Sequence, residues 1–361
     1  MSKTTKPVLG GLLAAVAALL SSAAVAQTTP WYPLPFDGKT VAGEEGRFDY
    51  TPLSASEKAT KPWNICVSLP HMKDPFFLAM NYGMTEEAKL LGVSVQTFDA
   101  GGYAQLANQI SQVENCVAGG ADAVVLVGIA REGMENLLSE LKAKNVPVID
   151  AVNGVASKDT AARVLTSPRD EGFRAARYLA EKHPAGSEPV DIAWLPGPAG
   201  AGFVEAFNTG FQEGLEGSAV NVVETKYGDV GKEVQARLVE DLLQTHPDLD
   251  YVVGTAVMVE GALPLLRARG IQDRVKLVSI YTTPGVYEMM KAGQIEAAGA
   301  APVVLTSRVI LDQAVRVLEN KLEYSDVGTL GQVYTKDTIG TLDPLSVLAP
   351  NGFRPDFAFR P

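Results

Sequence analysis

Residues 64–103 read NICVSLPHMKDPFFLAMNYGMTEEAKLLGVSVQTFDAGGY. The apolar run at 65–69 is short and rich in β-branched residues, so it predicts a buried strand, whereas residues 75–91 carry the longer amphipathic pattern of a helix. A second apolar run follows at 93–98. Because a strand, a helix and a second strand in this order favour parallel pairing, the stretch indicates an α/β fold.

The same alternation continues through both halves of the chain. Further strands are predicted at 123–127, 146–149, 163–165, 191–195, 220–225, 251–253, 277–280 and 295–300. Further helices are predicted at 103–118, 134–144, 170–182, 202–215, 232–246, 258–269, 284–291 and 303–319. Neither half contains a shorter internal repeat, so the pattern predicts two doubly wound parallel-sheet lobes joined by a hinge, with a ligand bound between them.

The first 26 residues carry the features of a secretory signal peptide. Lys3 and Lys6 precede an apolar run at 8–20, and the small residues Ala24, Val25 and Ala26 then form a cleavage site. We expect cleavage near Ala26-Gln27 and export to the periplasm. Since no later segment approaches the apolar length of a membrane span, we expect no direct membrane insertion after the signal is cleaved.

The rest of the chain divides into four further segments. Residues 27–63 are rich in Pro, Thr and Gly without a sustained period, and they predict an extended N-terminal arm. Residues 64–166 and 167–300 are the expected N-terminal and C-terminal α/β lobes. Residues 301–361 are expected to supply a return helix to the N-terminal lobe and a C-terminal tail that crosses both lobes.

The charge of the chain argues against nucleic acid as a partner. The chain of 361 residues has 31 Lys and Arg against 42 Asp and Glu, a formal charge of −11. Loss of the two lysines of the signal peptide takes this to about −13, a net charge that repels phosphate backbones. We therefore expect no nucleic-acid partner.

Cys66 and Cys116 are the two cysteines of the sequence. In an oxidising compartment, two thiols in one chain most simply form a disulfide, here closing a loop of about 50 residues. The alternative is a pair of buried thiols.

No enzyme motif is present in the sequence. Signatures of zinc hydrolases, dithiol redox proteins, serine acyl transferases and P-loop proteins are all missing. We therefore expect neither catalysis nor a metal or cofactor. The alternative is a secreted α/β enzyme with Asp74, Asp170 or Glu205 as its acid or base.

Aromatic residues and one carboxylate follow the ends of predicted strands, where binding loops of such sheets lie. Asp74, Phe76 and Phe77 follow the first strand, Tyr103 follows the second, and Tyr281 follows the strand at 277–280. Aromatic faces stack on sugars or hold alkylated ammonium groups, and a carboxylate accepts hydroxyls or balances a cation. The alternative is that one of the two phenylalanines belongs to the core.

Three weaker candidates complete the predicted site. Arg169 follows the expected crossover between the lobes, where it either meets ligand or pairs with Asp170 or Glu171. Glu205 either points into the cleft or lies on a solvated helix face. The glycine-rich stretches 100–102 and 196–202 either present backbone N–H groups to ligand or only turn the chain.

Several motifs resemble the type I periplasmic binding proteins, and within them the TorT family, periplasmic partners of the sensor histidine kinase TorS in trimethylamine N-oxide (TMAO) respiration. The resemblance covers most of residues 63–356. It is strongest at residues 73–74 with 78–84, 100–106 (AGGYAQL), 195–198 (LPGP), 253–256 (VGTA) and 351–355 (NGFRP), and it includes Asn153, Thr255 and the positions of both cysteines.

The resemblance implies a ligand caged by aromatic side chains between two lobes, and Tyr103, Tyr281 and Asp74 match that cage. Phe76 and Phe77 stand where the TMAO sensors have Tyr and Trp, and Pro168 stands where they have a second Trp. Because Trp is the strongest cation–π partner, these changes weaken a TMAO cage. With Arg169 and Asp170 at the hinge, they indicate a hydroxylated or carboxylated small molecule.

The resemblance therefore implies a non-enzymatic sensor protein that closes on a small polar molecule, such as TMAO, a related osmolyte, a sugar or a carboxylate. A membrane sensor histidine kinase such as TorS would read the closed form. The alternative is the solute-binding component of a sugar-type ABC transporter, in which a permease would read it.

Overall fold

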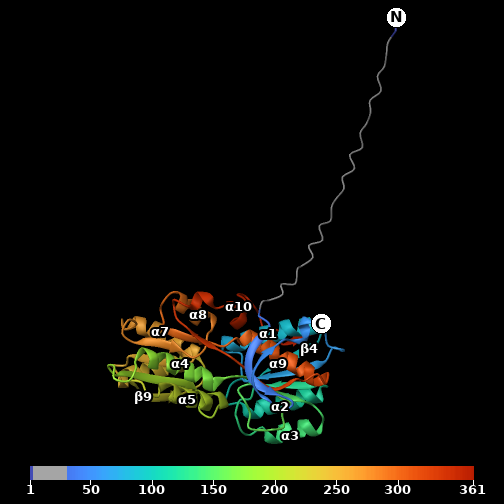
Figure 1. Cartoon of the computed structure of the whole chain (residues 1–361), viewed down its shortest axis with the longest axis horizontal. Coiled ribbons are helices and arrows are strands. Elements are labelled where there is room, and N and C mark those ends of the chain that lie inside the picture. The colour runs from blue at the N-terminus through green and yellow to red at the C-terminus, as the bar shows by residue number, and fades with distance from the viewer. Residues whose placement is uncertain (3–30) are drawn as a thin grey trace. The chain divides into compact units, whose positions relative to one another are not determined.

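The structure is a computed structural model that describes residues 1–2 and 31–361. The predicted signal peptide lies outside the described residues except for its first two. Residues 31–361 form one compact unit. Within that unit the strands assemble into a nine-stranded and a six-stranded sheet, with helices packed against both (Figure 1).

The nine-stranded sheet has the order β15-β4-β3-β5-β6-β7-β13-β1-β2. Its parallel centre consists of β3 (Asn64–Leu69), β4 (Ser94–Asp99), β5 (Ala123–Leu126), β6 (Val148–Val152), β7 (Ala162–Thr166) and β13 (Tyr324–Thr329). Its helices are α1 (Pro75–Leu91), α2 (Leu106–Ala118), α3 (Glu135–Ala143) and α9 (Val303–Leu318). β5 and β6 are buried along their whole length, as expected of parallel strands covered on both faces.

The six-stranded sheet has the order β14-β12-β11-β10-β8-β9. Its parallel strands are β8 (Val190–Gly197), β9 (Val220–Tyr227), β10 (Tyr251–Gly254), β11 (Lys276–Ser279) and β12 (Ala297–Ala300). Its helices are α4 (Pro168–Lys182), α5 (Gly202–Leu215), α6 (Lys232–Thr245), α7 (Ala256–Ala268) and α8 (Pro284–Lys291). The predicted two-lobed α/β fold is confirmed, and the predicted helices at 75–91, 202–215 and 284–291 have the observed bounds.

The chain crosses between the two sheets four times. It leaves the first sheet after β7 and enters α4, which packs against α5 beside the second sheet. It returns after β12 through α9, which packs against α1 beside the first sheet. β13 then joins the first sheet, β14 (Gln332–Tyr334) the second, and β15 (Ala358–Phe359) the first again. Between the last two lie a short 3-10 helix (Ile339–Thr341) and α10 (Pro344–Val347).

The described part of the N-terminal arm contains a hairpin that extends the first sheet. β1 (Leu34–Thr40) pairs antiparallel with β13 and with β2 (Glu45–Tyr50). A 3-10 helix (Leu53–Ala55) follows. Buried and exposed residues alternate at the start of β1: Leu34 and Phe36 are buried, and Pro35 and Asp37 are exposed. This alternation is typical of a strand with one buried face.

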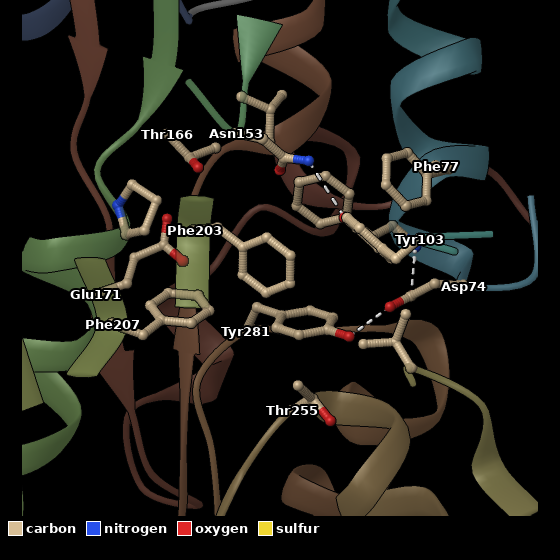
Figure 2. Close-up of a pocket in the computed structure, with 14 residues that line it drawn as sticks. Asp74, Phe77, Tyr103, Asn153, Thr166, Glu171, Phe203, Phe207, Thr255 and Tyr281 are labelled. Carbon is tan, nitrogen blue, oxygen red and sulfur yellow. Dashed lines mark hydrogen bonds between the residues drawn. The ribbon is translucent and has the colours of Figure 1, made fainter. Parts of the chain in front are cut away.

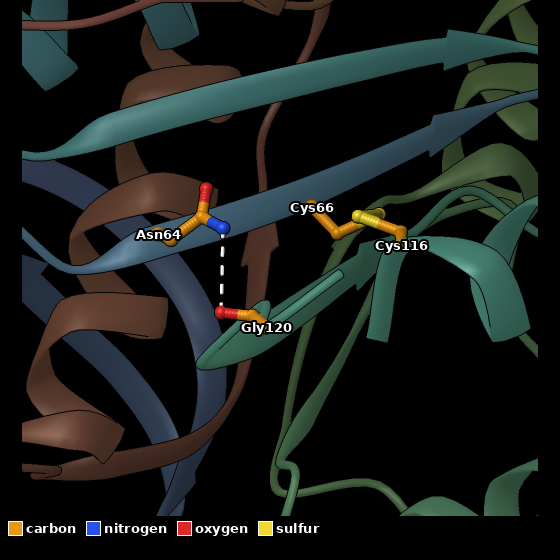
Figure 3. Close-up of a disulfide and its surroundings, with 4 residues drawn as sticks. All are labelled: Asn64, Cys66, Cys116 and Gly120. Carbon is orange, nitrogen blue, oxygen red and sulfur yellow. Dashed lines mark hydrogen bonds between the residues drawn. A yellow bond between two sulfur atoms is a disulfide. The ribbon is translucent and has the colours of Figure 1, made fainter. Parts of the chain in front are cut away.

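Cys66 on β3 and Cys116 on α2 form a disulfide, which confirms the first of the two sequence interpretations (Figure 3). Their Cα atoms are 6.3 Å apart and both side chains are buried. Beside them, the Asn64 side chain donates a hydrogen bond to the Gly120 carbonyl at 3.3 Å. The disulfide therefore ties β3 to α2, a helix that packs against it.

Within residues 1–2 and 31–361, none of the helices has the length and apolar character needed to span a membrane.

Candidate functional site

A cavity of about 50 Å³ lies at the carboxyl ends of strands from both sheets (Figure 2). Asp74, Tyr103 and Asn153 follow or end strands of the first sheet, whereas Thr255 and Tyr281 follow strands of the second. Parallel sheets gather their binding loops at these ends. The cavity is therefore placed where this fold class binds small molecules.

Aromatic side chains form most of the cavity wall. The rings are those of Phe76, Phe77, Tyr103, Phe203, Phe207 and Tyr281. They contact one another across the two sheets: the Phe76 and Tyr281 centroids are 5.8 Å apart, and those of Tyr103 and Phe203 are 5.5 Å apart. The remaining lining residues are the apolar Val152, Pro168 and Val230 and the polar Asp74, Asn153, Thr166, Glu171 and Thr255.

Asp74 connects the two sheets at one end of the cavity. As the N-cap of α1, it accepts a hydrogen bond from the Phe76 backbone N–H through Oδ1 at 2.9 Å. Its Oδ2 accepts a hydrogen bond from the hydroxyl of Tyr281, a residue that follows β11 of the other sheet. Burial raises the pKa of Asp74 to about 6, although both hydrogen bonds favour its ionised form. Both carboxylate oxygens therefore have donors from the protein itself.

Tyr103 and Asn153 form a second polar contact in the wall. The Asn153 amide donates to the Tyr103 hydroxyl at 3.2 Å and to the Gly128 carbonyl at 2.8 Å. Val152 has a φ of 63°, and the Asn153 backbone N–H closes a three-residue turn on the Ala151 carbonyl at 2.7 Å. A left-handed backbone is costly for a β-branched residue, so local strain is stored beside the cavity.

His71 lies behind the aromatic wall and does not line the cavity. Its ring contacts Phe77 and Tyr103 edge to face, with centroids 4.9 Å and 5.4 Å apart. Burial lowers the pKa of His71, so its ring is neutral at pH 7. The histidine supports the two rings and adds no charge to the site.

Glu171 lies at the other end of the cavity from Asp74 (Figure 2). It belongs to the first turn of α4, and its Oε1 is buried without a hydrogen-bond partner. Burial, with a smaller effect of the Asp170 charge, raises the pKa of Glu171 to about 8. Within the described residues, no Lys, Arg or His lines the cavity, so this carboxyl has no cation from the protein beside it.

The structure brings seven of the nine predicted ligand-binding residues to the cavity: Asp74, Phe76, Phe77, Tyr103, Asn153, Thr255 and Tyr281. Arg169 and Glu205 lie outside it. Arg169 forms an ion pair with Glu213 on α5 at 2.5 Å, and 63% of its side chain is exposed. Glu205 is exposed on α5, as its solvated-face alternative predicted.

The position of Arg169 corrects one expectation about the ligand. A carboxylated ligand was expected partly because Arg169 would meet it at the hinge. Instead Arg169 pairs with Glu213, Asp170 pairs with Arg174 at 2.5 Å, and the cavity holds two carboxyl groups. No basic side chain among the described residues lines the cavity to pair with an anion, so the position of Arg169 does not support a carboxylated ligand.

Phe203, Phe207 and Glu171 were missed because they lie within helices rather than directly after strands. Phe203 and Phe207 are four residues apart on α5, so they share one helix face. That spacing directly after the glycine-rich stretch 196–202 was the available signal. Nothing in the sequence distinguished Glu171 from the other acidic residues of its helix turn.

In the part of the chain that the structure describes, no group of three or more His, Cys, Asp or Glu is arranged to hold a metal ion. The polar groups of the cavity are two carboxyls, one amide and the hydroxyls of threonine and tyrosine. This set, enclosed by rings, is typical of a pocket for a small organic molecule.

Two α/β sheets with an aromatic cavity between their strand ends define a two-lobed small-molecule binding protein. Residues 65–322 match the family described as periplasmic binding protein domain. The chain belongs to this family of periplasmic binding proteins.

Two relatives are similar to this chain over most of its length. The periplasmic protein TorT of Escherichia coli K12 is 31% identical over 310 residues, which cover 86% of this chain and 87% of TorT. An ABC transporter solute-binding protein from Bradyrhizobium sp. BTAi1, crystallised with bound Bis-Tris, is 47% identical. It matches with a TM-score of 0.78 over 91% of this chain and 99% of its own.

A solved complex of the TorS sensor domain with TorT in the presence of TMAO contains a third similar chain. That chain is 31% identical, with a TM-score of 0.74 over 82% of this chain and 99% of its own. The same complex without ligand gives a TM-score of 0.75. The predicted resemblance to TorT is thus confirmed at the level of sequence and fold.

Proposed function

We propose that this protein is a periplasmic sensor component of TorT type that closes on a small polar molecule and presents the closed form to a membrane sensor histidine kinase such as TorS. The observation that carries the proposal is the likeness to TorT over most of both chains, in a fold that also matches TorT within its kinase complex. The proposed ligand-binding residues are the seven at the cavity together with Glu171, Phe203 and Phe207.

Closure around a ligand would change the outer surface of the protein, and a partner could bind that changed surface. Tyr281 reaches Asp74 across the cavity, and Phe203 reaches Tyr103, so both contacts join side chains of different sheets. A ligand that fills the space between these residues stabilises the arrangement in which they meet. A partner that binds the closed surface would then respond to ligand occupancy.

A second candidate function is supported by a specific observation. The Bradyrhizobium relative shares 47% identity and is described as an ABC transporter solute-binding protein. The two functions require the same cavity and the same closure, and they differ in the membrane protein that binds the closed form. Under either function the protein binds its small molecule without converting it, as a member of a binding-protein family and not of an enzyme family.

The first experiment measures ligand binding by thermal shift on the protein purified from the periplasm. A molecule that binds the native state alone must raise the unfolding temperature. The panel contains TMAO, Bis-Tris, choline and a set of sugars. A rise with one or more of them supports the proposal, whereas no rise with any of them contradicts it.

The second experiment separates the partners. The protein is mixed with the periplasmic domain of the sensor kinase from its own organism, and with the matching permease in detergent. Ligand-dependent binding to the kinase domain alone supports the sensor function. Binding to the permease alone supports the transporter function.

The signal peptide belongs to the same proposal. Cleavage near Ala26-Gln27 would release the chain into the periplasm. The N-terminal sequence of the protein purified from the periplasm tests this, and it should begin at or close to Gln27. A protein that retains Lys3 and Lys6 would contradict it.

A further inference from the structure

We propose that the ligand of this cavity is a cation, an alkylated or hydroxyalkylated ammonium whose charge is balanced by the carboxylate of Glu171. The proposal deepens the proposed function and rests on it, because it names the chemical class that the cavity selects. It goes beyond the aromatic cage, because it names the residue that supplies the counter-charge.

The first line of support is the isolation of Glu171. Its Oε1 is buried and has no hydrogen-bond partner in the described chain, although the side chain lines the cavity. The neighbouring Asp170 is neutralised by Arg174 on the same helix. A buried carboxylate without donor or cation is costly, so its partner is expected to be a group that the protein does not supply.

The second line of support is the lack of an internal competitor for that partner. Arg169 forms an ion pair with Glu213, and no Lys, Arg or His among residues 31–361 lines the cavity. The other carboxyl, Asp74, already accepts hydrogen bonds from Phe76 and Tyr281. A cation that enters the cavity therefore finds Glu171 as its one unpaired counter-charge.

The third line of support is the composition of the remaining wall. Phe203 and Phe207 lie near Glu171 in the cavity, and Tyr281 lies between Glu171 and Asp74 (Figure 2). The faces of aromatic rings attract the methyl and methylene groups of an ammonium ion, which carry part of its charge. The hydroxyls of Thr166 and Thr255 can pair with hydroxyl groups on such an ion. The wall thus suits a charged nitrogen with short apolar or hydroxylated arms.

The charge states of the two partners predict a proton exchange. In the ligand-free protein the raised pKa of Glu171, about 8, keeps this carboxyl largely protonated at pH 7. An ammonium ion favours the ionised form, so binding transfers the Glu171 proton to solvent and leaves a carboxylate–ammonium pair. The charged group that acts on Glu171 is Asp170 on its own helix, and the other titratable groups that line the cavity are Asp74, Tyr103 and Tyr281.

A purely structural role for Glu171 makes a different prediction. An acidic residue in the first turn of a helix stabilises the helix dipole, and its replacement would then lower stability without affecting ligand choice. The charge-balancing role predicts instead that the replacement reduces the preference for charged over neutral ligands to the part that the aromatic rings supply. Binding of a charged and a neutral molecule of the same shape distinguishes the two roles.

The test measures binding to the protein from the periplasm by thermal shift and isothermal titration at about pH 8. The probe pair is choline and its uncharged carbon analogue, which has a tert-butyl group in place of the trimethylammonium group. Choline should bind at least about tenfold more tightly than the analogue, because the shape is the same and the charge alone differs. Glu171→Gln should reduce this difference to the part that the aromatic rings supply, whereas Glu205→Gln, which loses an equal charge on exposed α5, should leave it unchanged.

The possible outcomes separate this proposal from the proposed function. Equal binding of choline and its analogue overturns the charge-balancing role and leaves ligand binding intact. Binding of TMAO or a sugar, with no binding of choline, does the same. If none of these molecules binds, the proposed function fails, and the cation proposal fails with it. A Glu171→Gln protein whose preference for choline is as large as that of the wild type also overturns the assignment of Glu171.

Discussion

Two regions of the molecule bury carboxylates in opposite ways. Asp312 on α9 anchors the N-terminal hairpin, where its oxygens accept hydrogen bonds from the Tyr50 hydroxyl at 2.5 Å, the Leu53 N–H at 2.7 Å and the Arg316 guanidinium at 2.7 Å. Glu171 in the cavity has a buried oxygen without any such partner. At Asp312, where the role is structural, the protein therefore supplies donors to both carboxylate oxygens.

The difference teaches how a binding site can be separated from a structural ion pair. A satisfied buried carboxylate contributes to the fold, since its desolvation is offset by its donors. An unsatisfied one lowers the stability of the free protein and is compensated when a ligand arrives. Asp74 is intermediate, because its two donors include Tyr281, whose contact with it depends on the approach of the two sheets.

The largest effect is expected from breaking the structural anchor. Asp312→Ala should lower the free energy of unfolding by ~3–5 kcal/mol, because it leaves the buried Arg316 with only the exposed Glu323 as a counter-charge. Denaturant unfolding measures this loss. Glu57→Ala is the control, because an exposed ion pair such as Glu57–Lys321 contributes little to stability. A loss at Asp312 no larger than that of the control would contradict the assignment of a structural anchor.

A smaller effect, on ligand binding, is expected from the aromatic wall. Tyr281→Ala and Phe76→Ala should each weaken binding of the ligand found in the thermal-shift panel by ~1–3 kcal/mol, because each removes a ring from the cavity. Isothermal titration measures the change, with Arg169→Ala as a control outside the cavity. Unchanged affinity in both ring variants would show that the ligand binds elsewhere.

A third effect is expected on the stability of the ligand-free protein. Glu171→Gln should stabilise it at pH 9, because it removes a carboxylate whose buried oxygen has no partner. The pKa of Glu171 is about 8 in the folded protein, and that of an unfolded glutamate is about 4.3. At pH values between these two, the folded protein keeps a proton on Glu171 that the unfolded protein has lost. Wild-type stability should therefore fall relative to the variant as the pH rises from about 5 to about 9.

Thermal unfolding of both proteins across this pH range measures that difference. It should be close to zero at about pH 4 and reach its full size above about pH 8. A variant less stable than the wild type at every pH would indicate a helix-capping role for Glu171 instead.

Much of the fold could be predicted from the sequence, because short apolar runs and amphipathic stretches alternate clearly along it. The helix at 75–91 was predictable at both ends, since Asp74 and Pro75 form a standard N-terminus and Gly92, with a φ of 75°, ends it. The hairpin of residues 34–50 was not predicted. Its strand β1 alternates over a few residues only, and it is stabilised by pairing with β13, almost 300 residues later in the chain.

The site was predictable where residues directly follow strands, as Asp74, Tyr103 and Tyr281 do. It was not predictable where helices tilt side chains back toward the cavity, as with Phe207 and Glu171, because only the packing of α4 against α5 decides which helix face reaches it. The absence of a partner at Glu171 is a property of three-dimensional arrangement, and sequence alone does not carry it.

The pH dependence of choline affinity tests the central claim most directly, since the charge of choline does not change with pH. If Glu171 with a pKa of about 8 must ionise to balance the ligand, the dissociation constant of the wild-type protein should fall about tenfold between about pH 7 and about pH 9. The Glu171→Gln protein should show no such fall. A wild-type affinity for choline that is constant or weakens over this range would contradict the claim that Glu171 balances a cation in the cavity.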